Sequence, residues 1–348
     1  MIKAKGWAAF GPSSPLGAYS FERREVGERD VQIDISHCGI CHSDLHTVRG
    51  DWGPQSYPIV PGHEIVGRVA KVGAKVDKLA VGDLAGVGCF VDSCGRCPQC
   101  ERGDEQFCEH GASFTYASVE QDGATPTQGG YSTTIVVRQE YALKIAKGQP
   151  LERVAPLLCA GITTYSPLRR YRVGKGTRVG VLGLGGLGHM AVKLAAAMGA
   201  EVTLLSTTRS KKADAQRLGA HDFAVHTEEA DWQRVRGRFD LVIDTVSAAH
   251  DLDHYVDLLG VGGTLVLVGA PQDLGKIGAF SLIGKRRAIA GSLIGGIRET
   301  QEMLDFCAQH GVLADVETIR AQEADQAYAR MLRSDVRYRF VIDCDSLR

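Results

Sequence analysis

The sequence predicts an α/β protein in which a β-rich domain of antiparallel strands is joined to a doubly wound domain with a parallel sheet. Short β-branched runs, alternating with polar residues and broken by Gly and Pro, fill the first 150 residues. From about residue 151, apolar strands alternate with segments of helical periodicity, which is typical of a parallel sheet covered on both faces. Glycine makes up 42 of the 348 residues, well above the usual ~7%, and indicates many tight turns.

Each element follows from a local pattern. In the β-rich part, alternation predicts strands at residues 31–35, 64–69 and 133–137. In the second part, short apolar runs predict parallel strands at residues 178–182, 201–205, 240–244 and 264–268. A helix over residues 300–310 and a strand over 339–342 close the chain. We therefore expect domains at residues 1–150 and 151–292, with residues 293–348 returning to the first domain.

The charge balance and the apolar pattern exclude some classes of partner. The formal charge is −1, from 40 Lys and Arg against 41 Asp and Glu, so nothing attracts the chain to a nucleic-acid backbone or an anionic membrane. No stretch approaches the ~18 uninterrupted apolar residues of a membrane span. Residues 1–11 lack the apolar core of a secretory signal. We expect a cytoplasmic protein that binds neither nucleic acid nor membrane.

Four of the ten cysteines form a compact motif. Cys94, Cys97, Cys100 and Cys108 have the spacing C-x2-C-x2-C-x7-C in a loop rich in Gly, Pro and charge. Four thiolates this close can surround one ion tetrahedrally, which is typical of a structural zinc site. An iron–sulfur cluster fits less well because the bacterial run has a shorter fourth spacing and a following Pro. Free thiols are the remaining alternative.

Three further residues are a candidate set of ligands for a second zinc ion. Cys41, His63 and Cys159 are scattered along the chain, and taken singly a buried cysteine is more often an inert core residue. Together, two thiolates and one imidazole make three protein ligands with an open fourth position, as in catalytic zinc sites.

A glycine-rich turn follows the predicted strand 178–182. Gly183, Gly185 and Gly188 match the pattern G-x-G-x-x-G, and a helical segment opens at Leu187. In that context the glycines let backbone N–H groups approach a pyrophosphate at a helix N-terminus. The alternative is a tight strand-to-helix turn without a ligand.

The end of the next strand predicts which dinucleotide binds. In NAD-binding domains a carboxylate about 20 residues after the turn bonds the ribose 2′-hydroxyl. Here that position is Ser206, followed by Thr207, Arg209, Lys211 and Lys212, with no acid among them. Hydroxyl and cationic donors suit a 2′-phosphate, so we expect NADP(H), although a basic run at a helix start is also common on a solvated face.

Taken together, these segments resemble the zinc-dependent medium-chain alcohol dehydrogenases. The resemblance rests on residues 39–46 (Gly-Ile-Cys-His-Ser-Asp-Leu-His), on residues 61–64 (Pro-Gly-His-Glu), on the four-cysteine loop and on residues 183–188 (Gly-Leu-Gly-Gly-Leu-Gly). Residues 158–165 and 290–295 look most like the cinnamyl-alcohol-dehydrogenase branch, whose bacterial members are broad aldehyde reductases. The resemblance covers nearly the whole chain and implies a GroES-like catalytic domain and a Rossmann cofactor domain.

The resemblance also implies catalytic roles. Zinc on the three scattered ligands would polarise an aldehyde oxygen. Asp44 would accept the second N–H of the ligand histidine and fix its tautomer. Ser43 would pass a proton to the developing alkoxide, relayed through the nicotinamide ribose and His46 to solvent. Glu64, beside a ligand, is expected to approach the metal in a resting state.

Further contacts with the dinucleotide and the substrate come from the same resemblance. Thr163 and Ser292 would lie by the nicotinamide, His42 near the pyrophosphate, and Arg337 is a further phosphate candidate. The other expected dinucleotide-binding residues lie in the glycine turn or where later strands end: Leu184, Gly186, Leu187, Thr245, Val268, Gly269 and Ile294. Trp52 and Tyr57 fall between two ligands and are expected in the substrate pocket, although both are equally consistent with ordinary packing.

The sequence thus predicts an NADP(H)-dependent zinc enzyme that reduces aldehydes to alcohols, with two zinc ions per chain. A zinc-free quinone or enone reductase on the same fold is one alternative, but such proteins lack the three-ligand set. A zinc module that binds nucleic acid or protein without catalysis is another, and both the charge and the glycine turn argue against it. A homodimer is expected from the resemblance.

Overall fold

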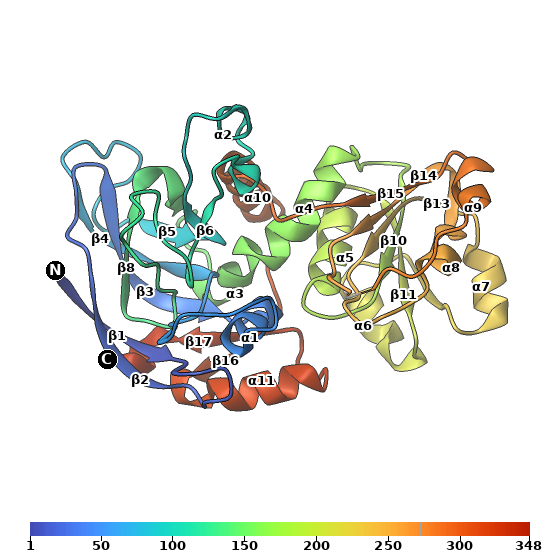
Figure 1. Ribbon diagram of the computed structural model, residues 1–348. Helices are drawn as coiled ribbons and strands as arrows, with labels where there is room; N and C mark the ends of the chain where they lie inside the picture. Colours follow the sequence, from blue (N-terminus) through green and yellow to red (C-terminus); the bar gives the residue numbers. More distant parts are fainter. Residues whose placement is uncertain (272) are drawn as a thin grey trace. The chain divides into compact units, whose positions relative to one another are not determined.

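The computed structural model describes residues 1–271 and 273–348 and divides into two compact units (Figure 1). Unit 1 comprises Met1–Cys159 and Gly295–Arg348, and unit 2 comprises Ala160–Ile294. The first division falls at residue 159 where the sequence suggested 150, and the second at 294 where it suggested 292. The closing segment of the chain therefore packs with the first segment.

Unit 1 is built around a seven-stranded sheet in which all the pairings but one are antiparallel. Its strand order is β16 (Val316–Arg320), β17 (Arg339–Asp343), β3 (Asp30–Gly39), β4 (Ile65–Val72), β5 (Leu84–Val87) and β9 (Leu143–Lys144), with β8 (Thr134–Arg138) also paired to β3. The strands expected at 31–35, 64–69, 133–137 and 339–342 are confirmed. Unit 1 also contains two small antiparallel sheets of two strands each: β1 (Ile2–Ala8) with β2 (Gly17–Arg23), and β6 (Phe90–Asp92) with β7 (Ser113–Phe114).

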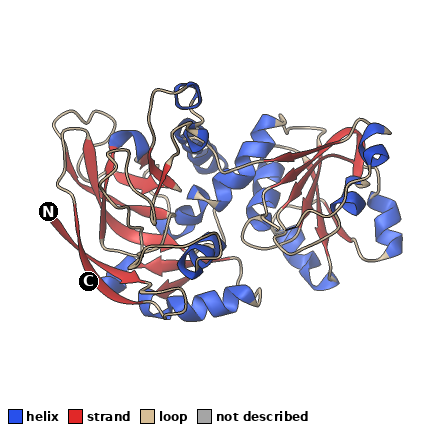
Figure 2. Ribbon diagram, viewed as in Figure 1, coloured by secondary structure: helices blue, strands red, loops and turns tan. Residues whose placement is uncertain are grey.

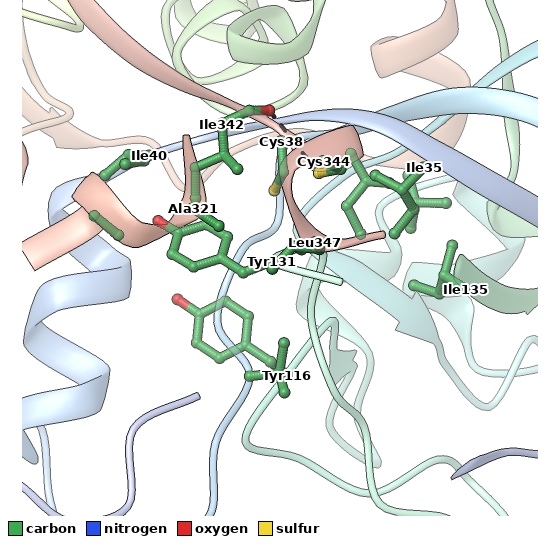
Figure 3. Close-up of a cluster of buried hydrophobic side chains, with 14 of the residues drawn as sticks. Ile35, Cys38, Ile40, Tyr116, Tyr131, Ile135, Ala321, Ile342, Cys344 and Leu347 are labelled. Atoms are coloured by element: carbon green, nitrogen blue, oxygen red, sulfur yellow. Dashed lines mark hydrogen bonds between the residues drawn. The ribbon is translucent and has the colours of Figure 1, made fainter. Parts of the chain in front are cut away.

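Alternation along β3 explains the core of unit 1. Ile33 and Ile35 are fully buried while Asp34 between them is not, because successive side chains of a strand point to opposite faces. Ile35, Tyr131 and Ile342 lie in one buried cluster (Figure 3). The helices of this unit are α1 (His42–Arg49), α2 (Pro98–Arg102), α3 (Leu151–Val154), α10 (Ile297–His310) and α11 (Ala324–Leu332), with short 3-10 turns at η1 (Glu105–Phe107), η2 (Gln139–Tyr141), η3 (Ala155–Leu158), η5 (Ala321–Glu323) and η6 (Cys344–Leu347).

Unit 2 is an all-parallel sheet of six strands with helices packed around it (Figure 2). The strand order is β12 (Asp222–Val225), β11 (Glu201–Ser206), β10 (Arg178–Leu182), β13 (Phe239–Asp244), β14 (Leu259–Leu267) and β15 (Ala288–Gly291). Its helices are α4 (Ala160–Arg170), α5 (Gly188–Ala197), α6 (Lys212–Arg217), α7 (Glu229–Val235), α8 (Leu252–Val256) and α9 (Ala279–Ile283), with the 3-10 turn η4 (Arg209–Lys211). The order of the strands reverses between β10 and β13, which is the point where doubly wound sheets bind ligands.

The predicted fold class is therefore confirmed. Within the described ranges, none of the helices has both the length and the apolar character needed to cross a bilayer.

Candidate functional site

Four buried side chains with metal-binding atoms meet in unit 1. Cys41 precedes α1, His63 and Glu64 precede β4, and Cys159 follows η3. One ligand atom from each lies within 4.8 Å of the others, and the sulfurs of Cys41 and Cys159 are 3.9 Å apart. Two thiolates on a tetrahedral zinc ion, each at ~2.3 Å, stand about 3.8 Å apart. The spacing therefore fits zinc, and the structure brings the three scattered ligands together.

Asp44 fixes the position of His63. This carboxylate is fully buried and lies 3.0 Å from Nδ1 of His63. It also accepts the backbone N–H groups of Cys41 at 2.8 Å and Gly62 at 3.1 Å. Because Asp44 occupies Nδ1, the second ring nitrogen, Nε2, is left with its lone pair for a metal.

The two thiols of the cluster differ in acidity. A hydrogen bond between them is the largest influence on both: it lowers the pKa of Cys41 and raises the pKa of Cys159. Cys41 is therefore the first of the pair to ionise, which suits it to begin metal binding because the thiolate is the ligand.

Glu64 is held by a buried arginine. Glu64 is 0% and Arg339 4% exposed, and the Arg339 guanidinium donates to Oε1 of Glu64. Burial lowers the pKa of Arg339, but the charges of Glu64, Cys41 and Cys159 raise it above its ordinary value, so the guanidinium stays charged. Oε2 of Glu64 is buried without a hydrogen-bond partner, and a Cβ on Gly39 would lie 1.8 Å from it. An unpartnered oxygen beside the cluster fits a carboxylate that can approach a metal.

The remaining candidates of this segment lie on or after α1. Ser43 Oγ is 3.6 Å from Cys41 Sγ, and His46 bonds Asp51 at 2.8 Å through Nδ1. Trp52 is 60% exposed, with its ring 5.2 Å from that of His46. Tyr57 instead donates its hydroxyl to the Val48 carbonyl at 2.8 Å and packs on the core of unit 1. This contact favours the packing role for Tyr57.

The four-cysteine loop is a second cluster with metal-ligand geometry. Cys100 Sγ lies 3.5 Å from Cys97 Sγ and 3.9 Å from Cys94 Sγ. Backbone N–H groups, chiefly those of Cys100 and Glu109, lower the pKa of Cys97 to about 6. Apart from Ala112, only the cysteines themselves make up the apolar cluster here. The loop therefore has almost no core of its own, and its donors fit a closed four-sulfur shell.

The glycine turn of unit 2 has the backbone geometry of a phosphate cradle. Gly183 has a φ of 90°, and a Cβ on Gly188 would lie 2.1 Å from the Gly183 carbonyl oxygen, so only glycine fits. The turn links β10 to α5, and a Cβ on Gly185 would meet open space. These glycines fit a dinucleotide pyrophosphate at the start of α5.

The expected 2′-phosphate donors lie at the end of β11. Ser206 is buried as the last residue of this strand, and Lys211 Nζ donates to the Leu184 carbonyl of the glycine turn at 2.9 Å. Arg209 makes a two-point ion pair with Glu228, with Nε 3.1 Å from Oε1. Arg209 is thus already paired with a carboxylate, a contact that no local sequence pattern predicts.

The other dinucleotide candidates fall into two groups. Five follow parallel strands of unit 2 as expected: Thr245 after β13, Val268 and Gly269 after β14, and Ser292 and Ile294 after β15. Thr163 is buried in α4 of the same unit. His42, the first residue of α1, and Arg337 both belong to unit 1 and are exposed.

Sequence reasoning missed Arg339, Tyr131 and Glu228. The Ile40 N–H bonds the Phe340 carbonyl at 2.9 Å, and this pairing brings Arg339 to the cluster. One signal was visible, because a charged residue inside the apolar run 339–342 requires a buried partner. Tyr131 and Glu228 carry no local signal of that kind.

Comparison with known proteins identifies both units. The model of the alcohol dehydrogenase GroES-like domain matches residues 27–147, and that of the zinc-binding dehydrogenases matches residues 186–309. NADP-dependent alcohol dehydrogenase C of Mycobacterium bovis is 53% identical over 347 residues, covering 100% of both chains. Aldehyde reductase YahK of Escherichia coli is 54% identical over 345 residues, covering 98% of each.

Among solved structures, the cinnamyl alcohol dehydrogenase of Helicobacter pylori complexed with NADP(H) superimposes with a TM-score of 0.92. It is 43% identical and covers 99% of both chains. Full-length identity above 50% to curated relatives, together with the fold and the two family models, leads to one conclusion. The chain belongs to the zinc-dependent medium-chain alcohol dehydrogenase family.

Proposed function

We propose that this protein reduces aldehydes to primary alcohols, and catalyses the reverse oxidation, with NADP(H) and a zinc ion held by Cys41, His63 and Cys159. The observation that carries the proposal is the convergence of these three ligands, and of Glu64, within 4.8 Å in a buried cluster. The names of the relatives, an NADP-dependent alcohol dehydrogenase and an aldehyde reductase, support the reaction class.

Two zinc ions are assigned to each chain. The first takes two thiolates and one imidazole, which leaves a position for a substrate oxygen. The second takes the closed shell of Cys94, Cys97, Cys100 and Cys108. The sulfur spacings of both clusters match tetrahedral zinc.

When bound, the zinc ion supplies Lewis acidity toward a carbonyl oxygen and NADPH supplies the hydride. Asp44 bonds Nδ1 of the His63 ring, which would leave Nε2 to bind the ion. Ser43, whose hydroxyl lies near Cys41, donates a proton to the substrate oxygen. His46 is one-third exposed and bonded to Asp51, so it can take a proton from water to replace the one that Ser43 gives up. Ser43 and His46 are the proposed proton path.

We assign the 2′-phosphate of NADP(H) to Ser206, Thr207, Arg209 and Lys211. Residues 206–211, between β11 and the end of η4, include no carboxylate of their own. Glu228, which follows the neighbouring strand β12, forms an ion pair with Arg209 and holds its guanidinium at the loop after β11. We assign the pyrophosphate to the glycine turn and the nicotinamide side to Thr163, Ser292 and Ile294.

Metal analysis and cofactor choice test the proposal together. The purified protein is expected to contain two zinc ions per chain and to reduce aldehydes with a higher kcat/KM for NADPH than for NADH. One zinc ion per chain, with activity on quinones or enones, would instead support a reductase on the same fold that lacks a zinc ion at the three-ligand set. Preference for NADH would contradict the assignment of the residues after β11.

Replacing Ser43 with Ala tests the proton path. Turnover is expected to fall by about 100-fold or more, within the usual range for a general acid, because the hydroxyl that serves the substrate oxygen is lost. Zinc content and NADPH affinity are expected to stay at the wild-type level. Steady-state kinetics with metal analysis measure both, and Ser36→Ala, a hydroxyl on β3 that bonds the Val66 carbonyl, is the matched control. Unchanged turnover would remove Ser43 from the path.

We also propose a cytoplasmic homodimer. None of the ten cysteines is in a disulfide bond, and thiols that ligate zinc stay reduced in a reducing compartment. β15 ends the strand order of unit 2, and nearby Phe280 and Ile283 are 84% and 67% exposed. An edge strand beside exposed apolar side chains is suited to pairing with a second copy.

A further inference from the structure

Tyr131 lies against the loop that carries His63. Its segment pairs with that loop: the Gly130 N–H bonds the Gly62 carbonyl, and the Tyr131 N–H bonds the Pro61 carbonyl, each at 2.9 Å. Gly62 has a φ of 105°, and a Cβ there would lie 2.6 Å from the Tyr131 ring. The ring therefore packs directly on the residue before His63, and only glycine allows this approach.

The Tyr131 hydroxyl reaches the carboxylate that holds His63. It donates to Oδ2 of Asp44 at 3.2 Å, and Oδ1 of the same carboxylate bonds His63 Nδ1. Tyr131 and Asp44 are both fully buried. A buried carboxylate needs hydrogen-bond donors to offset the loss of its hydration, and Tyr131 adds a side-chain donor to Oδ2 beside the Cys41 N–H.

A second tyrosine extends this chain of hydrogen bonds to the closing segment of the protein. Tyr328 of α11 donates its hydroxyl to that of Tyr131 at 3.4 Å. Burial and then the charge of Asp44 raise the pKa of both tyrosines well above the ordinary value, so both hydroxyls keep their protons and donate. Figure 3 shows the Tyr131 ring in the apolar core, with its hydroxyl on the same side as that of Tyr116. The hydrogen bonds therefore link Tyr328 to Tyr131, and Tyr131 to Asp44.

We propose that Tyr131 is a positioning residue for the zinc site, which acts by holding Asp44 and, through Asp44, His63, with Tyr328 acting through Tyr131. The inference rests on the proposed function, since it concerns the zinc ligand assigned there. Tyr131 packs on Gly62 and donates to Asp44, so it restrains the loop and the carboxylate together. Losing the hydroxyl leaves Oδ2 with one fewer donor at a fully buried carboxylate.

Zinc release from the two clusters provides the test. Tyr131→Phe is expected to release the zinc at His63 to a chromogenic chelator about 10-fold faster, the lower end of the range for groups that orient a ligand. Release from the four-cysteine cluster is expected not to change. Tyr141→Phe is the matched control, because the Tyr141 hydroxyl bonds Ser93 at 2.7 Å and Ser93 lies 3.2 Å from Cys100 Sγ. This variant is expected to affect the four-cysteine cluster alone.

A second variant separates positioning from general loosening. Tyr328→Phe is expected to speed release from the His63 site by a smaller factor, and the double variant is expected to be no faster than Tyr131→Phe. Equally faster zinc release from both clusters, or unchanged release from both, would overturn the inference. The proposed function would still stand in that case, provided that the wild-type protein contains two zinc ions. A wild-type protein without zinc at His63 would overturn both.

Discussion

Replacing His63 with Ala is expected to lower kcat/KM for aldehyde reduction by roughly 1,000-fold or more. A bound zinc ion contributes several kcal/mol by stabilising charge on the carbonyl oxygen, and each 1.36 kcal/mol corresponds to a factor of ten in rate. Without the imidazole, two thiolates remain, and the buried Asp44 loses the partner that lies 3.0 Å from it. The zinc count is expected to fall from two per chain to one, as measured by metal analysis.

The internal control is the second cluster. Its four sulfurs come from the loop after β6, and they should keep their ion in the His63→Ala variant. His310→Ala, at the exposed end of α10, is the matched substitution and is expected to leave activity and both zinc ions unchanged. A His63→Ala protein that retains two zinc ions and wild-type turnover would remove His63 from the ligand set.

The sequence predicted the parts of this fold and site that local patterns encode. The alternation of apolar and polar residues locates β3 and β4. The glycine turn is recognisable because Gly183 and Gly188 have a fixed spacing and because a side chain at Gly188 would collide with the backbone of Gly183. The four-cysteine motif is equally local. Cys41, His63 and Cys159, in contrast, became a set only through resemblance to a family, since residues 118 positions apart have no spacing rule of their own.

Contacts made by sheet topology could not be read from the sequence. Arg339 reaches Glu64 because β17 pairs with β3, a pairing between residues some 300 positions apart that no periodicity predicts. Tyr131 meets Asp44 for a similar reason, through a loop that pairs with residues 60–62. The ion pair of Arg209 with Glu228 depends on the neighbouring positions of β11 and β12. In each case the partner is set by tertiary structure.

The loop that carries the second cluster has little to hold it besides a metal. α2 is a helix of five residues, and a helix this short is not stable alone. The apolar cluster around it consists of the cysteines and Ala112. Structural zinc contributes on the order of 10 kcal/mol to the folding of such segments, which exceeds what this packing supplies. The order of the loop is therefore expected to depend on its zinc ion.

Replacing Cys97 with Ser is accordingly expected to release one zinc ion per chain and to lower the Tm by roughly 10–15 °C. An unfolding entropy of about 2.1 cal/mol/K per residue makes each kcal/mol worth about 1.4 °C in a chain of 348 residues. Opening the shell removes a thiolate that is ionised readily, with a pKa of about 6, and hydrogen exchange should accelerate across residues 93–113. Cys307→Ser is the matched control: Cys307 is equally buried, in α10, and contacts Met303 rather than a metal cluster. That variant carries the same cost of burying a hydroxyl and should keep both zinc ions. If calorimetry finds the two variants equally stable and exchange in the loop unchanged, the packing of the loop is sufficient without zinc, and its assignment as a structural site fails.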